Sequence, residues 1–97
     1  MAKEKVSKWD MAAYLKSEKE IAEYLDAAMG MNDPEYLPIA LGTAARARGM
    51  LKTSQETKLD RSSLYRALAK EGDPRLSTLS KVASTLGYRI TLVPIKS

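Results

Sequence analysis

Polar side chains between residues 61 and 66 carry the hydrogen-bond donors that base edges and phosphates accept. Their spacing of three and four residues would place them on one face of a helix: Arg61, Ser62, Tyr65 and Arg66. An arginine can hold a guanine through two hydrogen bonds, and a tyrosine can reach a phosphate or a thymine methyl. We therefore expect this face to contact double-stranded DNA. The alternative is an ordinary solvated helix face.

Residues on both sides of this helix extend the expected contact surface. Lys52 and Gln55 lie on the exposed side of the preceding predicted helix and are candidate phosphate contacts. Arg75 and Thr78 stand at the start of the last predicted helix, whose first amides favour an anion. Simple capping of that helix by Ser77 is the alternative interpretation.

Two further arginines, Arg46 and Arg48, precede this region. They either hold the two helices against their neighbours or touch the DNA backbone, and we favour the structural role.

The elements that must position these side chains are two short helices joined by a tight turn within residues 50–68. Met50 and Leu59 bracket the turn, and Leu64 and Leu68, four residues apart, turn one face of the second helix towards a core. Asp60 is a good N-cap because its carboxylate can accept amides of the first turn. This is the pattern of a helix-turn-helix, whose second helix enters the major groove of DNA.

Helices are also predicted on both sides of this pair. A capping box formed by Ser17 and Glu20 opens a helix that Gly30 closes. Asp33 is a candidate cap for the next helix, and Pro38 favours a regular start near residue 37. That helix is expected to end at Gly49.

Ser77 is expected to cap the last helix, and Gly87 should follow its end. The aromatic residues Trp9, Tyr14 and Tyr24 are expected to form a cluster that belongs to the core.

Residues 88–93 are rich in β-branched and aromatic residues and are followed by Pro94, which predicts a strand. One strand in a helical chain needs a partner. Two copies pairing antiparallel would make a homodimer, which suits a palindromic operator. The alternative is a tail folded over the core without ladder partners.

Composition narrows the function. With 97 residues, 44% of them hydrophobic, the chain should form one small domain with a core that a single layer of helices can bury. It contains no cysteine, which excludes a disulfide framework and a thiolate metal site, and no histidine, which removes the commonest general base and the commonest metal ligand. We expect no enzyme, no metal and no cofactor. No apolar run approaches a membrane span and no signal-peptide core is present, so we expect a cytoplasmic protein.

The net charge of +4 is unevenly distributed. Residues 1–45 hold 5 Lys/Arg against 8 Asp/Glu, a net charge of −3, and residues 46–97 hold 11 against 4, a net charge of +7. The basic half contains the predicted helix-turn-helix, as an anionic partner requires. The acidic half is a candidate docking surface for a basic protein.

Short motifs throughout most of the chain carry a family resemblance. They are Tyr14-Leu15, Ile21-Ala22, Tyr24-Leu25, Ala40-Leu41-Gly42, Ala45-Arg46-Ala47-Arg48-Gly49-Met50, Glu56-Thr57, Leu59, Ser63-Leu64-Tyr65-Arg66-Ala67-Leu68, Glu71-Gly72 and Leu86-Gly87. The chain resembles the XRE (Cro/repressor-like) helix-turn-helix class and, more narrowly, the addiction-module antidote proteins, which are the antitoxin halves of toxin–antitoxin operons.

The resemblance implies an all-α, lambda-repressor-like five-helix domain at residues 34–97, ending in the strand, with residues 1–33 as a helical extension packed on it. It also implies an antitoxin that represses its own operon and neutralises a small basic RelE/ParE-like toxin. A stand-alone or prophage XRE-type regulator without a toxin is the alternative, and a gene for such a toxin beside this one would separate the two. A third hypothesis is a protein-interaction module that does not bind DNA.

Three positions depart from the helix-turn-helix pattern. Thr53 stands where a larger aliphatic residue is usual, Ser54 where alanine is usual, and Lys58 where the turn usually has glycine. We expect some cost from the serine hydroxyl. A lysine in a left-handed conformation should cost about 1 kcal/mol.

Overall fold

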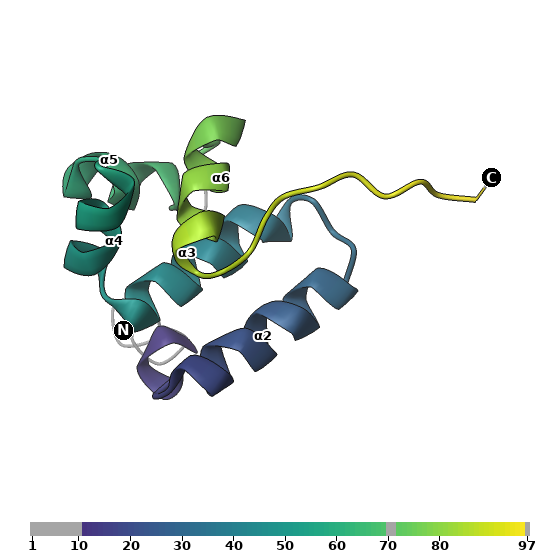
Figure 1. Cartoon of the computed structure of the whole chain (residues 1–97), viewed down its shortest axis with the longest axis horizontal. Coiled ribbons are helices and arrows are strands. Elements are labelled where there is room, and N and C mark those ends of the chain that lie inside the picture. Colours follow the sequence, from purple (N-terminus) through teal and green to yellow (C-terminus); the bar gives the residue numbers. More distant parts are fainter. Residues whose placement is uncertain (1–10, 70–71, 97) are drawn as a thin grey trace, which may run out of the picture.

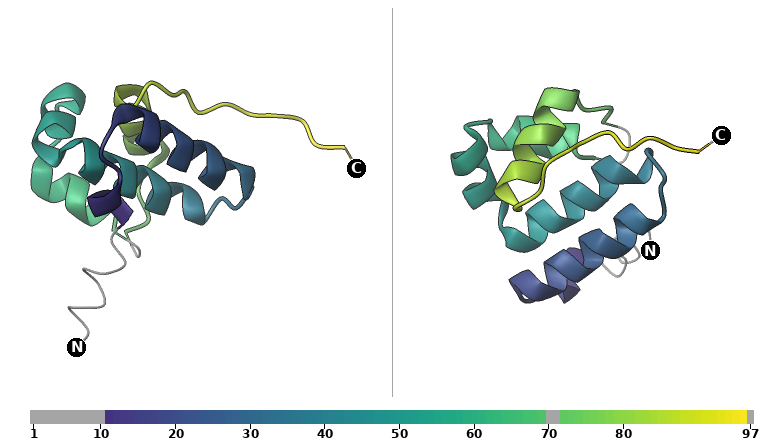
Figure 2. Two further views of the ribbon diagram at one scale, coloured as in Figure 1. Left: turned by 90° about the horizontal axis from the view of Figure 1, so that it is seen from below. Right: turned by 45° about the vertical axis from the view of Figure 1, so that its right-hand side comes forward.

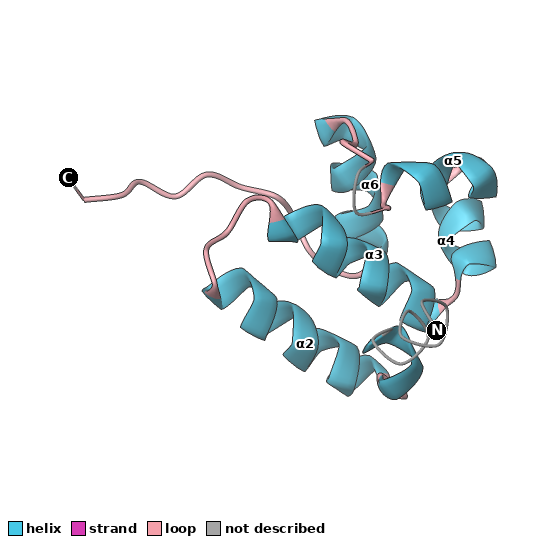
Figure 3. Ribbon diagram, turned by 180° about the vertical axis from the view of Figure 1, so that it is seen from behind, coloured by secondary structure: helices cyan, strands magenta, loops and turns pink. Residues whose placement is uncertain are grey.

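The computed structural model describes residues 11–69 and 72–96. Its regular elements in these ranges are five α-helices and one short 3-10 helix: η1 (Met11–Tyr14), α2 (Glu18–Gly30), α3 (Tyr36–Arg48), α4 (Met50–Thr57), α5 (Arg61–Ala67) and α6 (Leu76–Thr85). Figure 1 shows α3 between α2 on one side and α4, α5 and α6 on the other. The all-helical fold class is confirmed for the described residues, and Figure 3 shows loops alone between the helices.

The start of α2 is fixed by the predicted capping box. The Ser17 hydroxyl accepts the backbone N–H of Glu20 at 3.1 Å. The Glu20 carboxylate accepts the backbone N–H of Lys16 at 2.6 Å, one residue before the cap. Because these donors have no partner within the helix, the two side chains satisfy them.

Helix α3 is the central element and begins at Tyr36, close to the predicted start. Pro38 is tolerated as its third residue, because the first four amides of a helix have no partner within it. Gly49 ends the helix with φ of +117°, which favours glycine, and also precedes the first residue of α4. The predicted end of this helix is confirmed.

The core lies where α3 meets the other helices. Its buried apolar residues are Ile21, Leu25, Ala28, Ala40, Leu41, Ala44, Ala45, Met50, Leu64, Leu68, Leu79, Val82 and Ala83. Small residues on α3 allow close approach of α2, α4 and α6, which all pack against it. The core is therefore a sandwich of short helices around one alanine-rich helix.

The predicted aromatic cluster is only partly correct. Tyr24 packs against the core, and its hydroxyl lies 3.2 Å from that of Tyr36. This hydrogen bond is the main cause that raises the pKa of Tyr36 above its ordinary value, with burial second. Tyr14 is 60% exposed, and no residue of the 3-10 helix η1 is fully buried, although η1 packs against α3. Trp9 lies outside the described residues.

The predicted cap of the last helix is wrong. Helix α6 begins at Leu76, and its N-cap residue is Arg75, which makes no side-chain capping hydrogen bond. Ser77 already lies within the helix, so its hydroxyl cannot occupy the capping position.

The predicted C-terminal strand is wrong as well. Residues 88–96 form an extended segment without a strand, since no other described segment offers a strand edge. Tyr88 and Ile90 pack against the core, and the Tyr88 hydroxyl donates to the Asp26 carboxylate at 3.1 Å. Burial, followed by this hydrogen bond, raises the pKa of Tyr88. Towards its C-terminal end the chain runs away from the helices (Figure 2).

Among the described residues, no helix has both the length and the apolar character to cross a membrane. The division of the chain into an extension and a domain at residue 33 stays a prediction.

Candidate nucleic-acid interface

The candidate interface is built on the turn between α4 and α5. Lys58 adopts the expected left-handed conformation, with φ of +63° and ψ of +26°. Its backbone N–H donates to the Ser54 carbonyl at 2.8 Å, which ends α4. The Ser54 hydroxyl donates to the Leu59 carbonyl at 2.5 Å. The expected cost of that hydroxyl is therefore offset by a hydrogen bond across the turn.

Two buried threonines complete the turn. The Thr53 side chain is fully buried, and its hydroxyl donates to the Gly49 carbonyl at 2.9 Å. The Thr57 hydroxyl donates to the Thr53 carbonyl at 2.8 Å and accepts the backbone N–H of Leu59 at 3.2 Å. The polar residues in this turn are thus paired, and the two helices are held in one fixed relation.

Helix α5 presents a polar face outward. The Asp60 carboxylate accepts the backbone N–H of Ser63 at 3.1 Å, which confirms the predicted N-cap. Leu64 is buried, as is Leu68 directly after the helix, so the opposite face points to solvent. All four side chains predicted on that face are exposed: Arg61, Ser62, Tyr65 and Arg66.

A cleft between α5 and α6, of about 580 Å³, gathers three of the predicted contact residues. Arg66 reaches it from α5, and Arg75 and Thr78 from the start of α6. Gly72, Asp73 and Pro74 form another part of its wall. The cleft is lined by two arginines and one aspartate, so its side chains carry a net positive charge. No side chain caps the first amides of α6 beside it. The guanidinium groups and these amides are hydrogen-bond donors suited to an anion such as a phosphate.

Ser63 also lines this cleft, and the sequence analysis missed it. The signal was available, because Ser63 precedes Arg66 by three residues and so shares its side of the helix. Lys52 and Gln55 do not line the cleft. They lie exposed on α4, beside the turn, as predicted.

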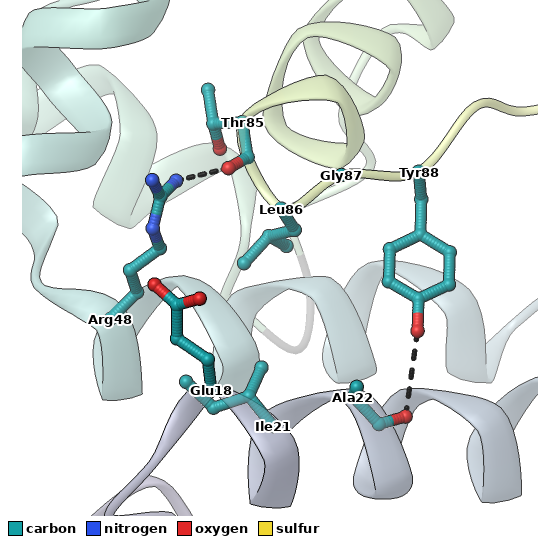
Figure 4. Close-up of a pocket in the computed structure, with 8 residues that line it drawn as sticks. All are labelled: Glu18, Ile21, Ala22, Arg48, Thr85, Leu86, Gly87 and Tyr88. Carbon is teal, nitrogen blue, oxygen red and sulfur yellow. Dashed lines mark hydrogen bonds between the residues drawn. The ribbon is translucent and has the colours of Figure 1, made fainter.

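Arg48 has a structural role, as we favoured from the sequence. Its guanidinium pairs with the Glu56 carboxylate, with N–O distances of 2.9 and 3.4 Å, and also donates to the Thr85 carbonyl. Figure 4 shows this side chain beside a hollow of about 310 Å³, which is lined by residues of α2 and of the end of α6. Tyr88 lines the same hollow, and its hydroxyl reaches the Ala22 carbonyl. Arg48 therefore connects α3, α4 and α6. Arg46 is exposed on α3.

The comparisons with known proteins give one family and one relative. Residues 5–94 match the model of a family described as probable addiction module antidote protein. An uncharacterized protein of Haemophilus influenzae (strain ATCC 51907 / DSM 11121 / KW20 / Rd) is 36% identical over 86 residues, which cover 89% of this chain and 89% of that protein. No solved structure matches the chain.

Proposed function

The chain belongs to the family of probable addiction module antidote proteins, and we propose that it combines toxin neutralisation with repression of its own operon through an XRE-type helix-turn-helix. In this proposal α4 and α5 are the two helices of the motif, and α5 enters the major groove. We also propose that the helices form a lambda-repressor-like domain, with α2 as its fifth helix, since residues 34–97 hold only the four α-helices α3 to α6 in the described part of the chain.

One observation carries the DNA-binding part of the proposal. The exposed face of α5 and the start of α6 share a cleft that is rich in donors, through Arg66, Arg75 and Thr78. Phosphate contacts from this cleft would fix the position of the protein on the duplex, while Arg61 or Arg66 would read a base. The affinity would fall as salt rises, because each phosphate contact releases counterions.

We also propose that the protein acts as a homodimer. A two-fold symmetric pair would place its two α5 helices in successive major grooves, about 34–36 Å apart, on a palindromic operator.

The proposed toxin is a small basic RelE/ParE-like protein. Helix α2 supports this choice, since it exposes a run of carboxylates: Glu18, Glu20, Glu23 and Asp26. Figure 1 and the right-hand view of Figure 2 place α2 across α3 from α5, so a toxin docked there would leave the DNA-binding face open. Complementary charge would steer the association of the two proteins.

We further propose that the chain works by binding and not as an enzyme. Its sequence contains no histidine or cysteine to serve as base or nucleophile.

Two cellular experiments test the proposal. A reporter gene placed behind the DNA upstream of this gene should be repressed when the chain is produced, and released when Arg66 and Arg75 are both replaced by alanine. Coexpression with a small basic protein encoded next to this gene should restore growth that this protein alone arrests. Unchanged reporter output would contradict autorepression, and continued growth arrest would contradict neutralisation of that protein.

A further inference from the structure

The last residues of the chain carry apolar side chains into solvent. Residues 91–96, termed the C-terminal arm, lead away from the helices towards the C-terminal end of the chain (Figure 1, Figure 2), while Thr91 and Val93 near its start still line a groove with residues of α2 and α3. Leu92 is 94% exposed, Val93 74% and Ile95 83%. Three large apolar side chains within four residues form an exposed patch of the kind that marks an interaction site.

An apolar groove of about 390 Å³ lies at the root of this arm. Its walls come from α2, α3, the end of α6, residues 88–90 and the arm itself, and include Leu25, Met29, Leu37, Leu41, Ile90 and Val93. The hydrogen bond from Tyr88 to Asp26 ties the chain to α2 just before this point. The segment before the arm is thus held against α2, and the arm starts at the edge of the groove.

One cation of the arm complements carboxylates near the groove. Lys96 lies at the end of the arm, and Asp33 and Glu35 are exposed on the loop after Asn32, which lines the groove. Arg89 lines the groove itself and adds no charge to the arm. An arm laid along an identical groove would therefore bring apolar side chains to apolar walls and Lys96 towards the two carboxylates.

We propose that the occupant of the groove is the C-terminal arm of a second copy of this chain. Both halves of the contact, arm and groove, lie side by side on one molecule, so a two-fold axis close to the arm would form the same contact twice. The choice of a second copy rests on the proposed function, because a palindromic operator needs two recognition helices. The arm contact assigns the surface that makes this dimer.

The test is the mass of the full chain in solution, measured by sedimentation over a concentration series. The wild-type chain should be a dimer. Replacing Leu92 and Ile95 together by aspartate should raise the dissociation constant of the dimer by about a hundredfold. Each dimer carries the change at two contacts, and each contact accounts for about a tenfold change. Leu51→Asp is the matched control, because Leu51 is 57% exposed on α4 and away from the groove. A wild-type chain that stays monomeric, or an arm variant that dimerises as tightly as wild type, would overturn the proposal.

Mixing separates a damaged contact from a damaged fold. Met29→Asp alters the groove at a residue that is 42% exposed and should also give monomers. The arm variant mixed with this groove variant should recover part of the dimer, because one intact arm still meets one intact groove. No recovery would overturn the proposal. A chain that dimerises but does not bind the operator would support the arm contact and contradict the proposed function. A chain that binds the operator as a monomer would support the proposed DNA binding and contradict the arm contact.

Discussion

The backbone of Gly42 in α3 runs directly against the Leu68 carbonyl at the end of α5. A Cβ atom at Gly42 would lie 2.9 Å from that oxygen and 3.2 Å from the Leu68 Cβ. No side chain larger than hydrogen fits there without a shift of backbone. This contact sets the distance between the central helix and the proposed recognition helix, so the candidate interface depends on a glycine that touches no ligand.

Gly42→Ala should therefore destabilise the protein. Overpacking of this kind lowers the free energy of unfolding by about 1–3 kcal/mol. The better helix propensity of alanine offsets at most about 1 kcal/mol of this loss. Denaturant unfolding measures the loss. Gly30→Ala is the control, since nothing lies within 4 Å of a Cβ there. Equal stability of the two variants would contradict the close approach of α3 and α5.

Lys58→Gly should stabilise the protein. Lys58 sits in the left-handed conformation that costs a residue with a side chain about 1–2 kcal/mol, and glycine avoids this at a smaller entropic cost, for a net gain of up to about 1 kcal/mol. Thermal unfolding would show a higher midpoint. Lys52→Gly, within helix α4, should instead lose about 1 kcal/mol. A loss at both positions would mean that Lys58 is not left-handed in solution.

Ser54→Ala tests the hydrogen bond across the turn. Removal of the hydroxyl leaves the Leu59 carbonyl without this donor and should cost about 0.5–1.5 kcal/mol, which the helix propensity of alanine offsets in part. Ser80→Ala on the exposed side of α6 supplies the comparison, because it makes the same chemical change away from the turn. If Ser54→Ala proves no less stable than Ser80→Ala in urea, the hydrogen bond contributes nothing.

Arg66→Ala should weaken DNA binding by about 1–3 kcal/mol if the guanidinium reads a base, and the loss should be confined to the specific site. Arg75→Ala, at a proposed phosphate contact, should weaken binding to all sequences and make the salt dependence shallower. Fluorescence anisotropy with operator and scrambled duplexes distinguishes the two patterns. Lys19→Ala removes the same charge on α2 and should change neither. Unaltered affinity in Arg66→Ala would remove Arg66 from the interface.

Glu23→Lys should weaken binding of the basic toxin by about tenfold or less, because a single exposed charge pair contributes about 0.2–1 kcal/mol and reversal adds repulsion. Substitution is preferable to deletion of residues 1–30, since Leu25 and Ala28 of α2 belong to the core. The opposite change on the same helix, Lys19→Glu, should maintain or strengthen binding. Calorimetry at two salt concentrations measures the affinity of both variants for the toxin. If neither substitution changes this affinity, the toxin binds another surface.

Sequence reasoning succeeded where local chemistry decides the structure. The caps at Ser17 and Asp60, the end of α3 at Gly49 and the left-handed Lys58 all depend on a few neighbouring residues. The outward face of α5 follows from the burial of Leu64 and Leu68 on the other side.

The predictions were wrong where contacts between distant parts of the chain determine the structure. Residues 88–93 have the composition of a strand, but a strand needs a partner edge, and no other described segment provides one. Tyr14 has the residue type of a core position but lies on a short 3-10 helix without a fully buried residue. The cleft that joins Arg66 to Arg75 depends on how α6 docks, which no spacing in the sequence encodes.

The most direct test of the account is a footprint of the purified protein on the DNA upstream of its own gene, with scrambled competitor and a salt series. The account predicts protection of a palindromic site that survives the competitor, with half-sites about one helical turn apart. Weak protection without sequence preference, which disappears as salt rises, would contradict it.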